Sequence, residues 1–243
     1  MRRDSEGVLA PPEFLPPSLR GLDPALVIEA LEPHVGDDRK ERLYAVLKQR
    51  LASLTVLFDA PYDPHNGAAV IRSCDAFGVG RLHVVERQKS FLFAQSVARG
   101  SERWVEVIKH ARPAEAAAAV KAEGYTLVGA EASGSLTPQD LPNVKKLCLV
   151  MGNEHDGIAE ELRAACDHHV RVPMRGFVES LNVSVTSAIL LAAAVPGREG
   201  DLDPAELQRL YARALYLSVN RAADVIAYKL SSDQEKSRIP SLR

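Results

Sequence analysis

Residues 147–161 read LCLVMGNEHDGIAEE, and this stretch decides the class of fold. It opens with five apolar residues, a run that is typical of a strand buried on both faces of a sheet. The strand ends at Gly152, a polar loop follows, and a predicted helix begins after Gly157, with Asp156 as its expected N-cap. Strand, polar loop and helix in this order form the repeating unit of a parallel α/β sheet. Glu154, within the loop, is either a solvated carboxylate or one that faces a ligand.

The same alternation extends in both directions from this stretch. Apolar runs predict five further strands, over Leu54–Phe58, Arg81–Val85, Trp104–Ile108, Tyr125–Ala130 and His168–Val172. Apolar residues at helical spacing predict helices over Asn66–Phe77, Pro113–Glu123, Ile158–Cys166, Ser180–Val195 and, after a Pro-Gly break, Pro204–Leu217. Alternating strands and helices predict an α/β fold class, a mostly parallel sheet with helices on both faces. Ligands of such sheets bind at the loops that leave the carboxyl ends of the strands.

Two appendages flank this core, which we assign to residues 54–197. Residues 1–38 contain six prolines, which break helices and strands, and they predict an extended arm with one short helix over Pro24–Leu31. Residues 39–53 predict a basic helix, with apolar side chains at helical spacing and charges on the opposite face. Residues 198–243 predict a helical extension.

Composition indicates a soluble globular protein. The 243 residues are 46% hydrophobic and 26% charged, which excludes disordered and fibrous classes. The first residues lack the apolar run of a secretory signal, and no segment reaches the ~20 apolar residues of a membrane span. Three cysteines without metal-site spacing suit a reducing compartment, as buried thiols: Cys74, Cys148 and Cys166. We therefore expect a cytoplasmic protein that does not contact a membrane.

Several cofactor and catalytic signatures are missing from the sequence. Gly78-Val79-Gly80 is a lone G-x-G, because a dinucleotide-binding fingerprint needs a third glycine where His83 stands. No serine has glycine two residues before and two residues after it, which excludes a nucleophile elbow. The histidines include the pair His168-His169, but they lack the spacing of zinc ligands, so no metal is expected.

The loop after the first strand, residues 59–78, carries two polar residues with alternative roles. Asn66 follows a proline-set turn and precedes a helix, so it is either an N-cap or a ligand-facing amide. Arg72 lies six residues further on, in an apolar run. It either pairs with Asp75 or places a fixed cation at the ligand edge of the sheet, where a phosphate or a developing oxyanion would sit.

The stretch 171–195, RVPMRGFVESLNVSVTSAILLAAAV, runs from a strand through a loop into a helix. Ser180 is either the N-cap of that helix or a residue with a functional role. Asn182 and Ser184 weaken a helix interior and offer side-chain donors, which favours a role in binding. The helix, residues 181–195, is apolar on nearly all faces. Such a helix is buried against its own sheet and, in an oligomer, against another subunit.

These three stretches, in this order, resemble the motifs of the SPOUT superfamily of RNA methyltransferases, in its TrmH-type 2′-O-ribose branch. The first motif, N-x-x-A-x-x-R, matches Asn66, Ala69 and Arg72. The second motif, G-x-E-x-x-G, matches Gly152, Glu154 and Gly157. The third motif, P-M-x-G-x-x-x-S-L-N-V-S-V, matches residues 173–185. The resemblance covers residues 39–217, most of the chain.

The resemblance implies a deep trefoil knot near residues 147–195. It implies S-adenosylmethionine held there in a bent conformation, largely by main-chain groups. The residues that it assigns to catalysis are Asn66, Arg72, Glu154, Ser180 and Asn182. Those that it assigns to the cofactor are Ala130, Gly152, Asn153, Glu154, His155, Asp156, Val172 and Leu181. It further implies a homodimer through the helix at 181–195.

The implied reaction is methyl transfer to a ribose 2′-hydroxyl of RNA. An arginine has no hydrogen-bond acceptor and a pKa above about 12. Arg72 therefore either stabilises the developing negative charge or acts as a base with the help of a phosphate. Leu54-Thr55-Val56, Asp63-Pro64-His65-Asn66 and the short flanking helices resemble most the enzymes that act on tRNA guanosine 18. Ribosomal RNA, a tRNA wobble position and a non-catalytic RNA-binding role stay open, and no DNA partner is expected.

The net charge of −2 conceals a segregation that bears on RNA binding. Residues 1–38 carry 3 basic and 8 acidic side chains, whereas residues 39–50 carry 5 basic and 1 acidic. Residues 81–112 are also basic, with 7 basic side chains against 3 acidic. Because phosphates attract such stretches, a near-neutral total does not exclude RNA. We expect RNA contacts from the basic helix and from the first motif loop: Arg39, Lys40, Arg42, Lys48, Arg50 and His65.

Overall fold

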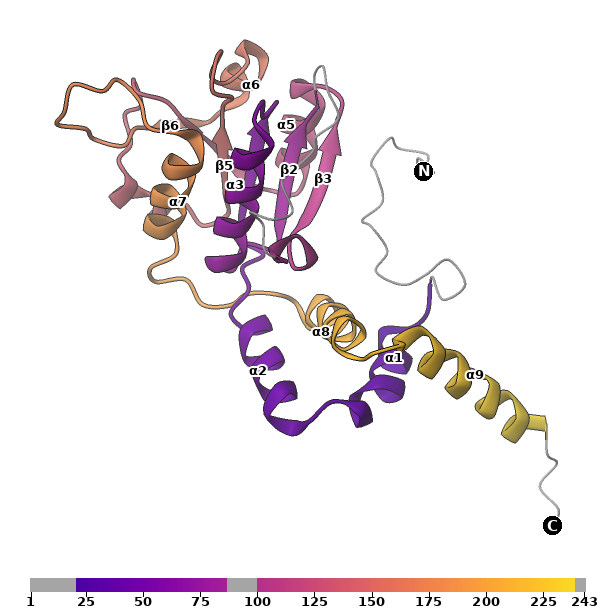
Figure 1. Ribbon diagram of the computed structural model, residues 1–243. Helices are drawn as coiled ribbons and strands as arrows, with labels where there is room; N and C mark the ends of the chain where they lie inside the picture. The colour runs from indigo at the N-terminus through magenta and orange to yellow at the C-terminus, as the bar shows by residue number, and fades with distance from the viewer. Residues whose placement is uncertain (1–20, 87–99, 239–243) are drawn as a thin grey trace. The chain divides into compact units, whose positions relative to one another are not determined.

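The computed structural model describes residues 21–86 and 100–238 (Figure 1). The chain divides into two compact units, Leu51–Glu199 and a helical unit made of residues 21–50 and 200–238. Within the described residues, no helix is both long and apolar enough to cross a bilayer. Most of the predicted amino-terminal arm, residues 1–20, and part of the second basic stretch, residues 87–99, lie outside the described part of the chain.

The first unit is built on a six-stranded sheet in which every neighbouring pair of strands is parallel. Its strand order is β3-β2-β1-β5-β4-β6. The strands are β1 (Leu54–Asp59), β2 (Arg81–Val85), β3 (Glu106–His110), β4 (Thr126–Ala130), β5 (Leu147–Met151) and β6 (His168–Val170). The predicted α/β class is confirmed. The third strand begins two residues later than predicted, because a short 3-10 turn, η3 (Ser101–Arg103), precedes it.

Helices cover both faces of the sheet (Figure 1). Successive residues of β1 point to opposite faces, so Val56 and Phe58 belong to one apolar core and Leu57 belongs to the other. The first core is closed by α3 (Pro64–Ala76) and α7 (Val183–Ala194), and the second by α5 (Pro113–Ala122) and α6 (Glu160–Ala165). The loop between β4 and β5 contains a further 3-10 helix, η4 (Pro138–Asn143), which packs on α7.

Three helices begin with the same Asp-Pro pair. Asp23, Asp63 and Asp203 are the N-caps of α1 (Pro24–Leu31), α3 and α8 (Pro204–Ser218), and each carboxylate accepts a hydrogen bond from a first-turn amide. The proline that follows each aspartate has a backbone geometry that suits the first helical position, where no amide hydrogen is needed. These short local signals fix where the helices start.

None of the three N-cap candidates of the sequence, Asn66, Ser180 and Asp156, caps a helix. Asp63, not Asn66, caps α3, which leaves the Asn66 side chain free for longer-range contacts. Asn182, not Ser180, caps α7, with its Oδ1 accepting from the Ser184 amide at 2.8 Å, so that helix begins at Val183.

The third correction concerns Asp156, which does not cap α6. Ala159 occupies the N-cap position, and its amide donates at 2.7 Å to Oδ2 of Asp59, a fully buried carboxylate at the end of β1. An acceptor 100 residues away in the chain thus holds the residue before α6, a helix that has no side-chain cap.

The helical unit contains α1, η2 (Glu32–His34), α2 (Asp37–Leu47), α8 and α9 (Ala222–Arg238). Helix α1 packs on both α8 and α9, and α2 packs on α8. The Tyr211 hydroxyl donates at 2.8 Å to Glu32 Oε1, and burial together with this carboxylate raises the pKa of Tyr211 to about 12. The two ends of the sequence, predicted as separate appendages, are thus one folded unit. Helix α9 lies within the helical extension that was predicted for residues 198–243.

Two histidines form a buried pair on neighbouring strands. His83 on β2 and His110 on β3 are 1% and 4% exposed, and His83 Nδ1 lies 3.0 Å from His110 Nε2. Burial, with the neighbouring His110 and Arg81, lowers the pKa of His83 to about 3, and burial also lowers the pKa of His110. Both rings are therefore neutral in the native protein at neutral pH.

This pair predicts acid sensitivity. Below pH 6.5 the unfolded histidines take up protons that native His83 does not accept until pH is about 3, so stability present at pH 7 is lost progressively over this window. The free energy of unfolding should fall by about 1.4 kcal/mol per pH unit for each such histidine. Urea unfolding between pH 7.5 and 5 measures it. His83→Leu should make the loss of stability with falling pH shallower, whereas the same substitution at exposed His34 should not. Equal pH slopes of the unfolding free energy in the two variants would contradict the prediction.

Candidate functional site

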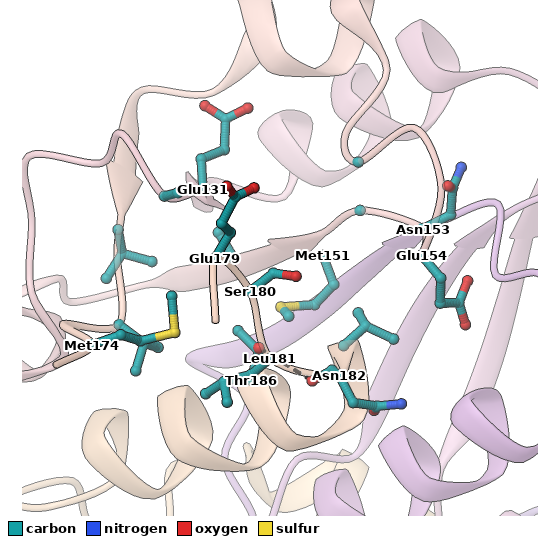
Figure 2. Close-up of a pocket in the computed structure, with 17 residues that line it drawn as sticks. Glu131, Met151, Asn153, Glu154, Met174, Glu179, Ser180, Leu181, Asn182 and Thr186 are labelled. Carbon is teal, nitrogen blue, oxygen red and sulfur yellow. Dashed lines mark hydrogen bonds between the residues drawn. The ribbon is translucent and has the colours of Figure 1, made fainter. Parts of the chain in front are cut away.

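A pocket of about 500 Å³ lies at the carboxyl ends of β4, β5 and β6 (Figure 2). This volume is within the range of pockets that hold small-molecule ligands, about 300–1,000 Å³. Its walls come from the ends of these strands and from the loop that leads into α7. Six of the residues predicted for a cofactor line it: Ala130, Gly152, Asn153, Glu154, Val172 and Leu181. Ser180 and Asn182, predicted for catalysis, line it as well.

The loop after β5 folds back tightly on itself. Asn153 Oδ1 accepts from the amides of His155 and Asp156, at 2.8 and 2.7 Å, and the Asn153 amide donates to the Gly157 carbonyl at 3.1 Å. His155 and Asp156 are exposed and do not line the pocket. Since their amides are already bonded to Asn153, the structure does not bring these two predicted cofactor residues into the site.

A chain of side-chain hydrogen bonds joins the three motif loops. Asn66 Nδ2 donates at 2.5 Å to Glu154 Oε1, and Asn182 Nδ2 donates at 3.0 Å to Asn66 Oδ1. Asn182 Oδ1 in turn accepts from the Ser184 hydroxyl at 2.6 Å. Each amide uses its donor at one end and its acceptor at the other, which fixes the orientation of both. Glu154 and Asn182 lie on the same side of the pocket in Figure 2, opposite Met174.

Arg72 and His65 lie outside the pocket. Arg72 is exposed on α3, and within the described residues it makes neither the predicted ion pair with Asp75 nor another hydrogen bond or ion pair. His65 is exposed in the first turn of α3, where its amide donates to the capping carboxylate of Asp63 at 2.8 Å. Both side chains are accessible to a large ligand approaching this helix.

The predicted basic helix is α2, in the helical unit. Arg39 donates to the Ser218 hydroxyl at 3.3–3.4 Å, and Lys40 pairs with Asp37 at 2.6 Å, a contact that raises the pKa of Lys40. Arg42 and Lys48 are exposed.

Arg50 does not fit this predicted surface. Helix α2 ends at Leu47, three residues earlier, and Arg50 is only 4% exposed in the segment that runs on to Leu51. A guanidinium this buried does not reach a phosphate, so its prediction as an RNA contact is wrong.

Other pocket residues were not predicted. Glu131 follows β4, and its carboxylate lies 2.7 Å from Arg163 Nε and 3.0 Å from His169 Nδ1. Glu179 and Met174 come from the loop before α7. A polar residue directly after a buried strand is the signal that would have found Glu131. Among the described residues there is no cluster of histidine, cysteine or carboxylate side chains that could hold a metal ion.

The pocket floor depends on the absence of a side chain at Gly152. A Cβ there would collide with the backbone of Gly157 and lie 2.5 Å from the Ile158 amide nitrogen. Gly152→Ala should therefore destabilise the unit by about 1–3 kcal/mol, as overpacking does, and lower Tm by a few degrees. Gly176→Ala, in the loop that leads into α7 and with no atom within 4 Å of its Cβ, is the matched control. Equal Tm values for the two variants in thermal unfolding would contradict the prediction.

Comparison with known proteins places this site in a family. The SpoU rRNA Methylase family model matches residues 53–192. The tRNA (guanosine(18)-2′-O)-methyltransferase of Escherichia coli K12 is 35% identical over 162 residues, which are 66% of this chain and 71% of that protein.

Two solved structures are also similar. The TrmH/SpoU tRNA modifying enzyme of A. aeolicus has a TM-score of 0.68 and 29% identity, and the match covers 76% of this chain and 98% of that one. The SpoU methyltransferase AviRb from Streptomyces viridochromogenes, in complex with the cofactor AdoMet, has a TM-score of 0.54 and 29% identity, with 61% of this chain and 60% of that one covered. With the family model matching more than half of its length, this chain belongs to the SpoU methylase family.

Proposed function

We propose that this protein transfers a methyl group from S-adenosylmethionine to a ribose 2′-hydroxyl of tRNA, at guanosine 18. The observation that carries the proposal is the hydrogen-bond chain Glu154–Asn66–Asn182, which joins three motif loops beside a pocket of suitable size. The name of the E. coli relative supports tRNA guanosine 18 as the substrate, and tRNA as substrate favours a cytoplasmic location.

The pocket fits S-adenosylmethionine. The backbone cradle at Gly152 admits a ligand close to the main chain, and Met151 and Leu181 offer apolar surface. The exposed carboxylate of Glu179 suits a ligand that carries positive charge, whereas that of Glu131 is already paired with Arg163. When bound, this cofactor supplies an electrophilic methyl group on a sulfonium.

The residues of the chain then orient and stabilise the acceptor. The Glu154–Asn66–Asn182 chain holds two amides and a carboxylate in fixed orientation beside the pocket, and fixed orientation alone supplies up to about 7–11 kcal/mol in such displacements. Ser180 adds a hydroxyl in the pocket wall. Arg72 lies outside the pocket, so its partner in this proposal is the RNA and not the cofactor. Its guanidinium stabilises the negative charge that develops on the oxygen of the ribose 2′-hydroxyl.

RNA docking extends the proposal to the helical unit. Arg39, Arg42 and Lys48 are exposed on or directly after α2, and Lys40 is partly exposed beside Asp37. Their spacing on a single short helix suits the phosphate backbone of an RNA. His65 serves the same role at the start of α3.

A trefoil knot is part of the proposal. Backbone hydrogen bonds tie the loop between β4 and β5 to the segment after it: the Leu136 amide donates to the His169 carbonyl, and the Arg171 amide donates to the Leu136 carbonyl, both at 2.9 Å. A Cβ at Gly134 would collide with the backbone of residues 169–171. Such close passage of the later segment against the earlier loop supports threading of one through the other.

A homodimer through residues 181–195 is the last part of the proposal. In the single chain only Ser187, Leu190, Leu191 and Ala194 of α7 are buried, although the helix is almost wholly apolar. Val185 is 47% exposed, and Phe177 in the preceding loop is fully exposed. Apolar surface of this kind on a folded unit supports an interface with a second copy.

The dimer predicts that Val185→Glu separates the protomers. A carboxylate buried without a partner at an interface costs several kcal/mol, so the dimer dissociation constant should rise at least ~100-fold. Sedimentation equilibrium measures it. Ala118→Glu, on the exposed face of α5, is the matched control and should leave the dimer unchanged. A monomeric wild type would contradict the dimer.

The methylation predicts a specific effect of Arg72→Ala. Losing one stabiliser of developing charge should lower the methylation rate about 10²–10³-fold, while calorimetry shows unchanged binding of S-adenosylmethionine. Lys145→Ala removes an exposed cation outside the pocket and should not change the rate.

A tRNA transcript without modifications is incubated with the protein and S-adenosylmethionine. Mass spectrometry of the product should then find 2′-O-methylguanosine at position 18. Methylation of another nucleotide would overturn the substrate, and undiminished turnover in Arg72→Ala would overturn the role of Arg72.

A further inference from the structure

Tyr62 is an exposed aromatic residue joined to the second motif loop. It is 66% exposed, and its backbone amide donates to Glu154 Oε2 at 3.3 Å. Its ring meets the ring of His155 at 4.9 Å between centroids and 86° between planes. One side of the ring is thus supported by protein while much of its surface stays open to solvent.

The backbone on both sides of Tyr62 is fixed. Ala60 has a φ of 48°, in the left-handed region that a residue with a side chain rarely adopts, and its amide donates to the Val85 carbonyl at 3.0 Å. Asp63, on the other side, caps α3. Strained backbone of this kind persists where the surrounding structure holds it, often at binding sites. The loop therefore presents the ring in a set position.

We propose that Tyr62 stacks on the nucleobase of the nucleotide whose ribose is methylated, an inference that rests on the proposed function. Base and ribose are joined covalently, so a ribose placed beside Glu154 and Asn66 brings its base close to Tyr62. The backbone amide of Tyr62 donates to the carboxylate of that same Glu154. Proteins bind unpaired bases by stacking them on exposed aromatic rings. A neutral ring among polar and charged neighbours suits the flat face of a base better than it suits a phosphate.

A cycle of protein and RNA variants tests the stacking. Tyr62→Leu and the wild type are each assayed on intact tRNA and on tRNA with an abasic site at the methylated nucleotide. Stacking is worth about 1–3 kcal/mol per base, so Tyr62→Leu should lower kcat/KM on intact tRNA by about 5- to 150-fold. On the abasic tRNA, which has no base to stack, the same substitution should change kcat/KM less than about twofold. Tyr62→Phe keeps the ring and should behave as the wild type on both.

Two measurements separate stacking from a role of Tyr62 in cofactor binding or in assembly. Calorimetry with S-adenosylmethionine should give the same affinity for Tyr62→Leu and wild type, and sedimentation the same oligomeric state. Equal losses on both tRNAs would assign Tyr62 to holding Glu154 and overturn the stacking, as would no loss on intact tRNA or a changed oligomeric state. Tyr228→Leu, at an exposed tyrosine on α9, is the matched control and should show no difference between the two tRNAs. Failure of the wild type to methylate any tRNA would instead overturn the proposed function itself.

Discussion

The amide of Asn66 is the constraint on which the site depends. It is 8% exposed, its nitrogen donates to Glu154, and its oxygen accepts from Asn182. Serine is too short to span the two partners, and an ionised aspartate cannot donate, so the amide supplies both functions at this reach. Because Asn66 and its two partners come from three separate stretches of sequence, one side chain ties the three motif loops together.

The sheet explains why these loops meet at all. Strands β1 and β5 are adjacent and parallel, so the loops that follow them leave the same edge side by side. Strand β6, two places further along the sheet, ends at that edge too and leads to the loop before α7. Apolar packing on both faces holds this arrangement, and the polar contacts at the edge refine it rather than create it.

Much of the fold could be predicted because its signals are local. Runs such as LCLVM are buried on both faces and read as strands, and the helices between them carry clear helical spacing. The failures arise where another group takes the expected contact or where an element ends early, and only one of the competing groups is distant in the chain. Asp156 has the residue type of a cap, but Asp59 accepts from the Ala159 amide instead, and Arg50 continues a basic pattern, but α2 ends at Leu47.

The candidate site was only partly predictable. Motif spacing identified Gly152, Glu154 and Asn182, which the structure gathers at one pocket. It did not identify Glu131, which belongs to none of the motifs although it directly follows a buried strand. It also could not tell that the amides of His155 and Asp156 are bonded to Asn153.

The buried carboxylate of Asp59 has a consequence for how the two motif loops can change together. Its bond to the Ala159 amide ties the end of β1 to the start of α6, and the Glu154–Asn66 bond ties the first turn of α3 to the loop after β5. These two bonds, at different points along the chain, oppose sliding of one loop past the other. Insertions in either loop would have to fall between the residues that make these two bonds. Variation in loop length should therefore be confined to the few residues that take part in neither bond.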